Sequence, residues 1–111
     1  MFDVGDVCLM ELPSSDGHEQ TGQRPCLIIS EMEANTLLVV PFTTNLRAIK
    51  YLSSIQIEPS SLNGLDNTSI ALVFQLRAID VKRLIKKIGV LEEEYLKDVK
   101  LILSKKILWS L

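Results

Sequence analysis

A polar, glycine-bounded loop at residues 17–25 concentrates the side chains that could do chemistry. It carries the only histidine of the chain, His18, followed by Glu19, Gln20 and Arg24. An imidazole can accept or donate a proton near neutral pH because its ordinary pKa is about 6.5. A guanidinium stays charged and offers a fixed fork of donors to phosphate oxygens. Since functional residues concentrate on loops held by a rigid scaffold, this cluster is a candidate site.

Short strands are the elements that must position the loop. Apolar runs predict them at residues 4–12, 25–30, 36–42, 54–57, 68–74 and 86–90. Pro41 cannot donate to a ladder, so it is expected at a sheet edge or bulge. From Glu92 to about Trp109 the apolar spacing becomes helical, and the acidic start suits the positive end of a helix dipole. The pattern predicts an α+β, mainly β fold: a small, curled β-barrel with a C-terminal α-helix packed on it.

Length and composition limit the possibilities further. A chain of 111 residues predicts a single domain, 1–111. No run approaches the roughly 18 apolar residues of a membrane span, and residues 1–6 lack the order of a signal peptide. We therefore expect a cytoplasmic protein without a membrane partner. The apolar fraction of 47% then predicts a hydrophobic partner surface, most simply that of a homodimer.

The two cysteines, Cys8 and Cys26, stand alone in the sequence. There is no Cys-x-x-Cys motif and no histidine nearby, so the spacing indicates neither a zinc site nor a redox pair. Each is expected to act as a small buried apolar residue within a strand. The sequence therefore predicts no metal and no cofactor.

Charge is unevenly distributed along the chain. The net charge of −2 argues against a generic nucleic-acid coat. The eight basic residues after position 80 are interpreted mainly as the solvated face of a helix. The four basic residues before it, Arg24, Arg47, Lys50 and Arg77, all border predicted loops. Their placement favours a site of restricted extent over a broad basic surface.

Gly-Asp-Val at 5–7 is followed by the loop block at 17–25, Val-Pro-Phe-Thr-Thr at 40–44 and Gln-Leu-Arg-Ala-Ile-Asp at 75–80. In this order and spacing, these blocks resemble the MazF/PemK type of toxin endoribonuclease. The resemblance spans nearly the whole chain. It implies an SH3-like β-barrel with a C-terminal helix, which forms a homodimer and is blocked by a partly disordered antitoxin. The implied activity is metal-independent, sequence-specific cleavage of single-stranded RNA by attack of the 2′-hydroxyl.

The resemblance assigns catalytic roles to three residues. Arg24 matches the catalytic arginine of the family, where it would support the crowded phosphorane. The alternative is that Arg24 pairs with Glu19 and pins the loop. Thr43 matches a catalytic threonine whose hydroxyl can contact the scissile phosphate, although it could simply cap a turn. His18 is a candidate for proton transfer, or a structural or exposed histidine.

A second set of residues is expected to contact RNA. Arg47 and Lys50 would position the RNA through its phosphates, and Tyr51 could stack a base. Glu19 and Gln20 either contact RNA bases or shape the loop through hydrogen bonds to backbone groups. Gln75 and Arg77 either contact RNA or form structural pairs with Asp80. Thr44 is a further expected RNA contact and could substitute for Thr43.

Phe74 departs from the family pattern. The position before Gln75 is often acidic in the family, and that carboxylate is a candidate general base. A phenylalanine cannot take a proton. The base would then be His18, Glu19 or water, and losing one acid–base contribution of about 10²- to 10⁴-fold leaves a slower enzyme or a non-cleaving relative.

The alternatives come from other functional classes. Gyrase-poisoning toxins of the CcdB type share this barrel and act by binding through an exposed C-terminal tryptophan. Trp109, near the end of this chain, is similar in position. Its simpler interpretation is that it packs the end of the helix onto the barrel. A third hypothesis is a dimeric scaffold with an inert loop. The sequence identifies neither the RNA motif nor the antitoxin.

Overall fold

The computed structural model describes residues 2–13, 17 and 20–108, except for the side chains of residues 107 and 108. In this part of the chain, seven strands form one antiparallel sheet. The strands are β1 (Asp6–Leu12), β2 (Gly22–Met32), β3 (Thr36–Thr43), β4 (Ser54–Ile57), β5 (Ser69–Leu72), β6 (Arg77–Asp80) and β7 (Leu84–Val90).

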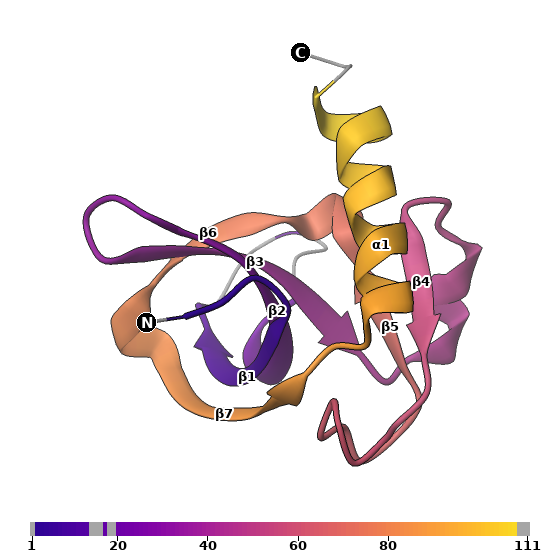
Figure 1. Ribbon diagram of the computed structural model, residues 1–111, viewed down its shortest axis with the longest axis horizontal. Helices are drawn as coiled ribbons and strands as arrows, with labels where there is room; N and C mark the ends of the chain where they lie inside the picture. Colours follow the sequence, from indigo (N-terminus) through magenta and orange to yellow (C-terminus); the bar gives the residue numbers. More distant parts are fainter. Residues whose placement is uncertain (1, 14–16, 18–19, 109–111) are drawn as a thin grey trace.

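The helical elements are short apart from one. Helix α1 (Glu93–Ile102) continues into a π-helical segment, Leu103–Leu108. Three 3-10 helices connect strands: η1 (Leu46–Lys50), η2 (Val73–Gln75) and η3 (Val81–Arg83). Helix α1 stands beside β4 and β5, and the β2–β3 hairpin projects on the opposite side of the molecule (Figure 1). The prediction of a mainly β fold with a C-terminal helix is confirmed.

The sheet is curled but open. Its strand order is β4-β5-β3-β2-β1-β7, with β6 also paired to β3, and within the described residues the end strands β4 and β7 do not pair. Strand β3 is central because it pairs with β6 along its first half and with β5 at its end. Pro41 lies between these two segments, after the Val39–Arg77 pair and before the Phe42–Ala71 pair. A residue without an N–H therefore occupies the position where β3 changes partner.

Alternation along the strands divides most of the buried interior between two clusters. Neighbouring residues such as Val39 and Val40 point to opposite faces, and β1, β2 and β3 each contribute to both clusters. One cluster lies under α1, which buries Leu96 and Val99 there. The other lies between β1, β2 and β3 and contains Cys8 and Cys26. Strand β2 supplies Leu27 to the first cluster and Cys26 and Ile28 to the second, so it is buried on both faces.

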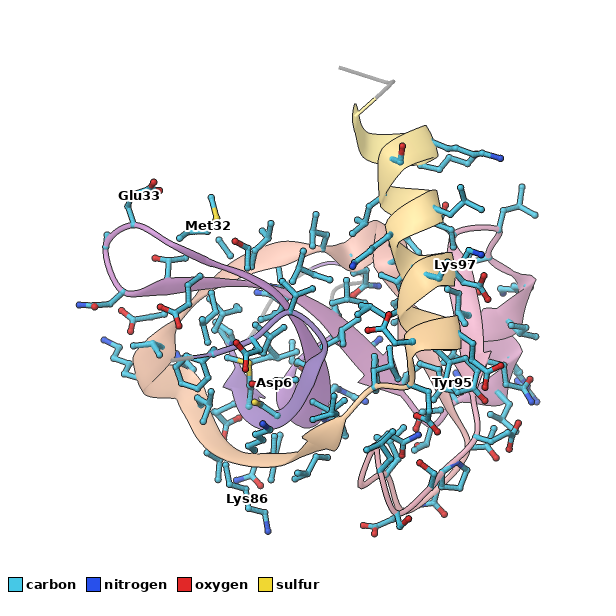
Figure 2. The ribbon with its side chains drawn as sticks, viewed as in Figure 1. Asp6, Met32, Glu33, Lys86, Tyr95 and Lys97 are labelled. Carbon is cyan, nitrogen blue, oxygen red and sulfur yellow. The ribbon has the colours of Figure 1, made fainter. Side chains whose placement is uncertain are left out.

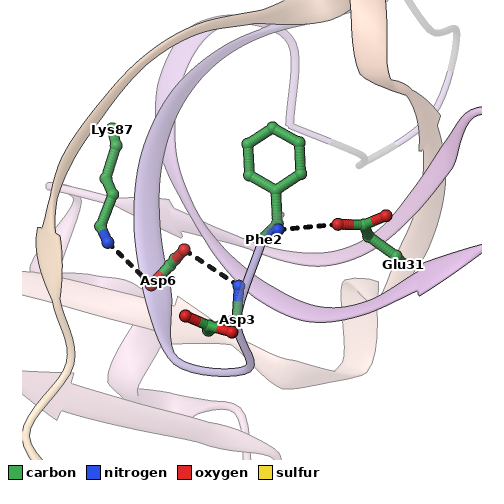
Figure 3. A network of polar contacts seen from close by, with 5 residues as sticks. All are labelled: Phe2, Asp3, Asp6, Glu31 and Lys87. Carbon is green, nitrogen blue, oxygen red and sulfur yellow. Dashed lines mark hydrogen bonds and ion pairs between the residues drawn. The ribbon is translucent and has the colours of Figure 1, made fainter.

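The N-terminal segment is tied to the sheet by polar contacts (Figure 3). Asp6 is only 3% exposed; its carboxylate pairs with Lys87 Nζ at 3.2 Å and accepts a hydrogen bond from Asp3 N–H. The backbone N–H of Phe2 donates to Glu31 Oε1 at 2.7 Å, and this hydrogen bond lowers the pKa of the Glu31 carboxyl. These contacts fix the start of β1 against β2 and β7.

Candidate functional site

A cavity of about 640 Å³ opens where β3 and β5 end and the 3-10 helices η1 and η2 begin. Its walls come from segments far apart in the sequence. The lining residues are Gln20, Thr43, Asn45, Arg47, Ala48, Lys50, Tyr51, Leu72, Phe74 and Gln75. Two of the lining side chains are cationic and none is acidic, so the cavity suits an anionic ligand.

The wall formed by η1 is built on two successive side-chain caps. Thr43 Oγ1 accepts a hydrogen bond from Asn45 N–H at 3.1 Å, and Asn45 Oδ1 accepts one from Arg47 N–H at 3.2 Å. Short polar side chains favour this capping because they satisfy the free N–H groups at a helix start. The caps fix the direction of η1, whose Arg47 and Lys50 both line the cavity. Thr43 itself is 7% exposed.

An aromatic pair forms the neighbouring part of the wall. The Tyr51 and Phe74 rings lie with their centroids 5.0 Å apart and their planes tilted by 54°. Lys50 Nζ lies 5.3 Å from the centroid of the Tyr51 ring, within the range of a cation–π contact. Phe74 therefore contributes an apolar ring where the resemblance led us to look for a carboxylate.

At the edge of the cavity near the polar loop, the side chains of Gln75 and Arg77 both hydrogen-bond to the backbone of Gln20, and we call these two hydrogen bonds the clamp. Gln75 Oε1 accepts a hydrogen bond from Gln20 N–H at 2.9 Å, and Arg77 Nη1 donates one to the Gln20 carbonyl oxygen at 3.0 Å. Asp80, considered as a partner for Gln75 and Arg77, instead accepts a hydrogen bond from Lys82 N–H. Gln75 and Arg77 thus position the end of the loop.

Arg24 lies on β2 and is half-buried. Its Nε donates to the carbonyl oxygen of Thr21 at 2.8 Å. Within the described residues its two terminal nitrogens contact no carboxylate. The β2–β3 ladder ends at the Cys26–Pro41 pair. Arg24 on β2 and Thr43 on β3 each lie two residues beyond this pair. Because side chains alternate along a strand, Arg24 and Thr43 are on the same face as Cys26 and Pro41.

The structure brings together six of the residues predicted from the sequence and separates others. These six line one cavity: Gln20, Thr43, Arg47, Lys50, Tyr51 and Gln75.

Of the remaining predicted residues, Arg77 reaches that group only through Gln20. Thr44 is exposed and does not line the cavity, and neither does Arg24. His18 and Glu19 lie outside the described residues, so their predicted roles, and the possible Arg24–Glu19 pair, stay predictions.

The cysteines are structural. Cys8 and Cys26 are fully buried free thiols that lie directly opposite each other on β1 and β2. Burial raises the pKa of both thiols, that of Cys26 from 9.0 to about 12. The prediction that they act as small buried residues is confirmed. Among the described residues, no three His, Cys, Asp or Glu side chains gather closely enough to hold a metal ion.

Residues 3–107 match the PemK-like, MazF-like toxins of type II toxin–antitoxin systems. The chain belongs to this family. An endoribonuclease MazF of Staphylococcus saprophyticus is 34% identical to it over 103 residues, which cover 89% of this chain and 85% of that protein. The gyrase-poison alternative finds no support among these relatives, and Trp109, on which it depended, lies outside the described residues.

Solved MazF structures share the fold of this toxin. The crystal structure of MazF from Deinococcus radiodurans (Form-I) superposes with a TM-score of 0.78 at 23% identity, covering 98% of this chain and 96% of that one. The MazE–MazF crystal structure (Form-II) from the same organism gives 0.66 at 24% identity, with 92% of each chain covered. A mycobacterial endoribonuclease in complex with its cognate antitoxin gives 0.62 at 16% identity, covering 91% and 87%.

Some residues of the toxin's cavity were not predicted from the sequence. Asn45 was missed, although an asparagine that follows a strand and precedes a short helix is a recognisable cap. Phe74 was noted only as a missing acid, and its contact with Tyr51 depends on segments 23 positions apart in the chain. Ala48 and Leu72 form apolar floor, which no local signal distinguishes from ordinary core.

Proposed function

We propose that this toxin is a metal-independent, sequence-specific endoribonuclease that cleaves single-stranded RNA by attack of a 2′-hydroxyl on the adjacent phosphate. The observation that carries the proposal is the cationic cavity at the end of β3, lined by the hydroxyl-bearing Thr43 and without acidic side chains among its lining residues. The Staphylococcus relative, named an endoribonuclease, supports the same class of reaction.

The reaction needs a base for the 2′-hydroxyl, positive charge for the phosphorane and a proton for the departing 5′-oxygen. Arg24 supplies the positive charge, and its terminal nitrogens have no carboxylate partner in the described part of the chain. Thr43 contributes a hydroxyl that already accepts from Asn45 N–H and can donate its own proton to a phosphate oxygen. Arg24 stays protonated, so it is a poor base.

Proton transfer at the 2′-hydroxyl falls to His18, Glu19 or water. Phe74 occupies the position where the family often has an acid, and its ring packs on Tyr51. His18 has the most suitable ordinary pKa of the three candidates. The products of this chemistry are a 2′,3′-cyclic phosphate and a 5′-hydroxyl.

RNA is held mainly through the cavity wall. Arg47 and Lys50 contact its phosphates, and Gln20 lies where a base edge can reach its side chain. We also propose RNA contacts for Glu19 and Thr44, the other members of the predicted RNA-binding set. Gln75 and Arg77 support it by holding the backbone of Gln20.

The partners proposed here are an antitoxin and a second copy of the chain. Neighbouring structures named as complexes with MazE or a cognate antitoxin support the first. Large apolar side chains that remain exposed, such as Leu46, Ile49 and Leu52, support the homodimer.

The curled sheet is best described as SH3-like. In the described residues, no helix is long and apolar enough to cross a bilayer, and we propose a cytoplasmic location.

The decisive experiment incubates the purified protein with a long single-stranded RNA in EDTA and maps the cut ends. We expect cuts at a short shared motif, with cyclic phosphate and 5′-hydroxyl termini. Arg24→Ala should reduce cleavage by about 10²- to 10³-fold, as expected for a lost donor to a developing oxyanion. Trp109→Ala should cleave normally.

A matched control removes a cation that does not line the cavity. Lys97 is exposed on α1 and is not among the lining residues, so Lys97→Ala should leave cleavage unchanged (Figure 2). Intact RNA, together with topoisomerase-linked DNA breaks that require Trp109, would overturn the ribonuclease proposal.

A further inference from the structure

The Tyr51–Phe74 pair is a feature that the proposed cleavage chemistry leaves without a role. Tyr51 is 43% exposed and Phe74 is 42% exposed, although both rings are large and apolar. Their mutual contact covers only part of each ring, and both side chains line the cavity. Exposed aromatic faces beside polar groups are surfaces on which a planar ligand can stack.

The backbone beneath the rings is held in place. Phe74 N–H donates to the carbonyl oxygen of Ser53 at 3.3 Å, which ties η2 to the turn after Tyr51. Ser54 Oγ donates to the carbonyl oxygens of Tyr51 at 2.6 Å and of Ala48 at 3.2 Å. Because both rings stand on cross-linked backbone, they need little ordering when a ligand binds.

The charges around the rings fit a phosphate next to a planar ring. Lys50 Nζ lies 5.3 Å from the Tyr51 ring centroid, and Arg47 lines the same cavity. The combination of stacking rings and backbone-tracking cations is typical of sites for single-stranded nucleic acid. The cavity volume of about 640 Å³ falls within the range of small-ligand sites.

A polar group for the edge of the ligand is also present. Asn45 Oδ1 is used by Arg47 N–H, and in the described part of the chain the Asn45 amide NH₂ has no acceptor. It lines the same cavity as the rings. A carbonyl oxygen or ring nitrogen of a nucleobase is a suitable acceptor for this donor.

Given the ribonuclease function proposed above, on which this inference rests, we propose that Tyr51 and Phe74 form a stacking platform for one unpaired nucleobase of the RNA. Lys50 binds the adjoining phosphate and Asn45 donates to the base edge. Phe74, at a position that is often acidic in the family, thus acts in substrate recognition. The platform contributes to the choice of cleavage site.

The test measures binding apart from cleavage. Fluorescein-labelled 2′-O-methyl oligoadenylate and oligouridylate cannot be cut by 2′-hydroxyl attack, and an abasic 2′-O-methyl oligomer of equal length matches their charge. We expect the wild-type protein to bind at least one base-bearing oligomer roughly 5- to 150-fold more tightly than the abasic one, the range for stacking on one aromatic platform. The signal is fluorescence anisotropy at fixed salt concentration.

Variants assign the preference to the rings. Phe74→Leu and Tyr51→Leu should each lose most of the preference and keep the affinity for the abasic oligomer, whereas Phe74→Tyr should retain it. Leu62→Ala is the matched control, because Leu62 is a leucine that is 53% exposed and does not line the cavity. Thermal unfolding of each variant verifies that it is folded.

The possible outcomes test the stacking platform independently of the ribonuclease proposal. Base-dependent binding that both Leu variants lose supports the platform even if the wild-type protein cuts no RNA. Equal loss of affinity for all oligomers, or no loss in either Leu variant, overturns the platform even if the protein cleaves RNA. Antitoxin binding that needs the rings, without any preference for bases, also overturns it.

Discussion

The amide oxygen of Gln75 accepts a hydrogen bond of 2.9 Å from the backbone N–H of Gln20, 55 positions earlier in the chain. Arg77 adds a bond to the carbonyl oxygen of the same residue. The end of the polar loop is therefore anchored to the segment between β5 and β6. A change at Gln75 will act on the site through the loop position as well as through any contact with RNA.

Replacing Gln75 should release the Gln20 amide. In Gln75→Ala, we expect the Gln20 N–H to exchange with solvent about 5-fold faster, because a net hydrogen bond of about 1 kcal/mol is lost. Hydrogen exchange followed by NMR on the free protein measures this effect. A residue that served only to bind RNA would leave the exchange rate unchanged without RNA.

Gln56→Ala is the matched control for this change. Gln56 is an exposed glutamine on β4 whose side chain donates to Glu58 at 2.9 Å. Its removal should not alter exchange at Gln20. Equal acceleration in both variants would mean that the effect is general loosening, and would contradict the clamp.

Thr43 and Thr44 should respond differently to the same substitution. Thr43→Val removes the hydroxyl that lines the cavity and caps Asn45 N–H, so we expect cleavage to fall by about 10- to 100-fold and stability by about 1 kcal/mol. Thr44 is exposed and outside the cavity, so Thr44→Val should remain within about 2-fold. Thr43→Ser should recover most of the activity, measured as initial rates on one mapped RNA site.

The sequence predicts the strands better than their partners. Period-two and continuous apolar patterns located most strands, and residues 54–57 were predicted with the bounds that the structure has. The strand β6 (Arg77–Asp80) was missed because it holds only four residues and contains two charged ones. Pro41 was expected at an edge or bulge. It lies inside the central strand, where β3 changes partner, and local sequence carries no information about that change.

The site was predictable where its residues are neighbours in sequence. Thr43, Arg47 and Lys50 lie close together in the sequence, were all predicted as site residues and line the same cavity. For residues in distant segments, residue types could be predicted but their contacts could not: nothing local indicates that Gln75 and Arg77 meet at Gln20, or that Phe74 faces Tyr51. These pairings depend on the register of distant strands, which is set by the whole sheet.

The β2–β3 hairpin contains a residue that strains it. Ala34 has φ of +57° and Asn35 has φ of +55°, both in the left-handed region. Asparagine tolerates this conformation, whereas for alanine it costs about 1–2 kcal/mol. Ala34→Gly removes this strain. The glycine also increases the conformational entropy of the unfolded chain, which lowers stability by about 0.4–1 kcal/mol. We therefore expect a net stabilisation of about 0 to 1.6 kcal/mol, measured by urea unfolding.

Ala78→Gly provides the opposite case in the same sheet. Ala78 is an exposed residue of β6 paired with Leu38 of β3, in ordinary extended backbone. A glycine there should destabilise the protein by about 0.5–1 kcal/mol. If Ala34→Gly destabilises to the same extent, the left-handed strain at Ala34 is not significant.

Cys26 should make stability fall at alkaline pH. Burial raises the pKa of its thiol to about 12, against 9.0 for the ordinary group. Between these values the unfolded chain loses the proton and the folded chain keeps it, so unfolding releases a proton and rising pH favours the unfolded state. Below pH 9 the effect is absent. The limiting slope for one proton is about 1.4 kcal/mol per pH unit.

Lysines and tyrosines titrate in the same pH range. The Cys26 contribution is therefore the difference between the pH dependence of the unfolding free energy of the wild-type protein and that of Cys26→Ala. Urea unfolding under reducing conditions, repeated from below pH 9 toward pH 12, should give a flatter decline for Cys26→Ala than for the wild-type protein. Val39→Ala leaves a comparable gap in the same buried cluster without removing a titrating group, so it should lower stability and keep the wild-type slope. Identical slopes for the wild type and Cys26→Ala would show that the buried thiol does not titrate differently in the folded and unfolded states.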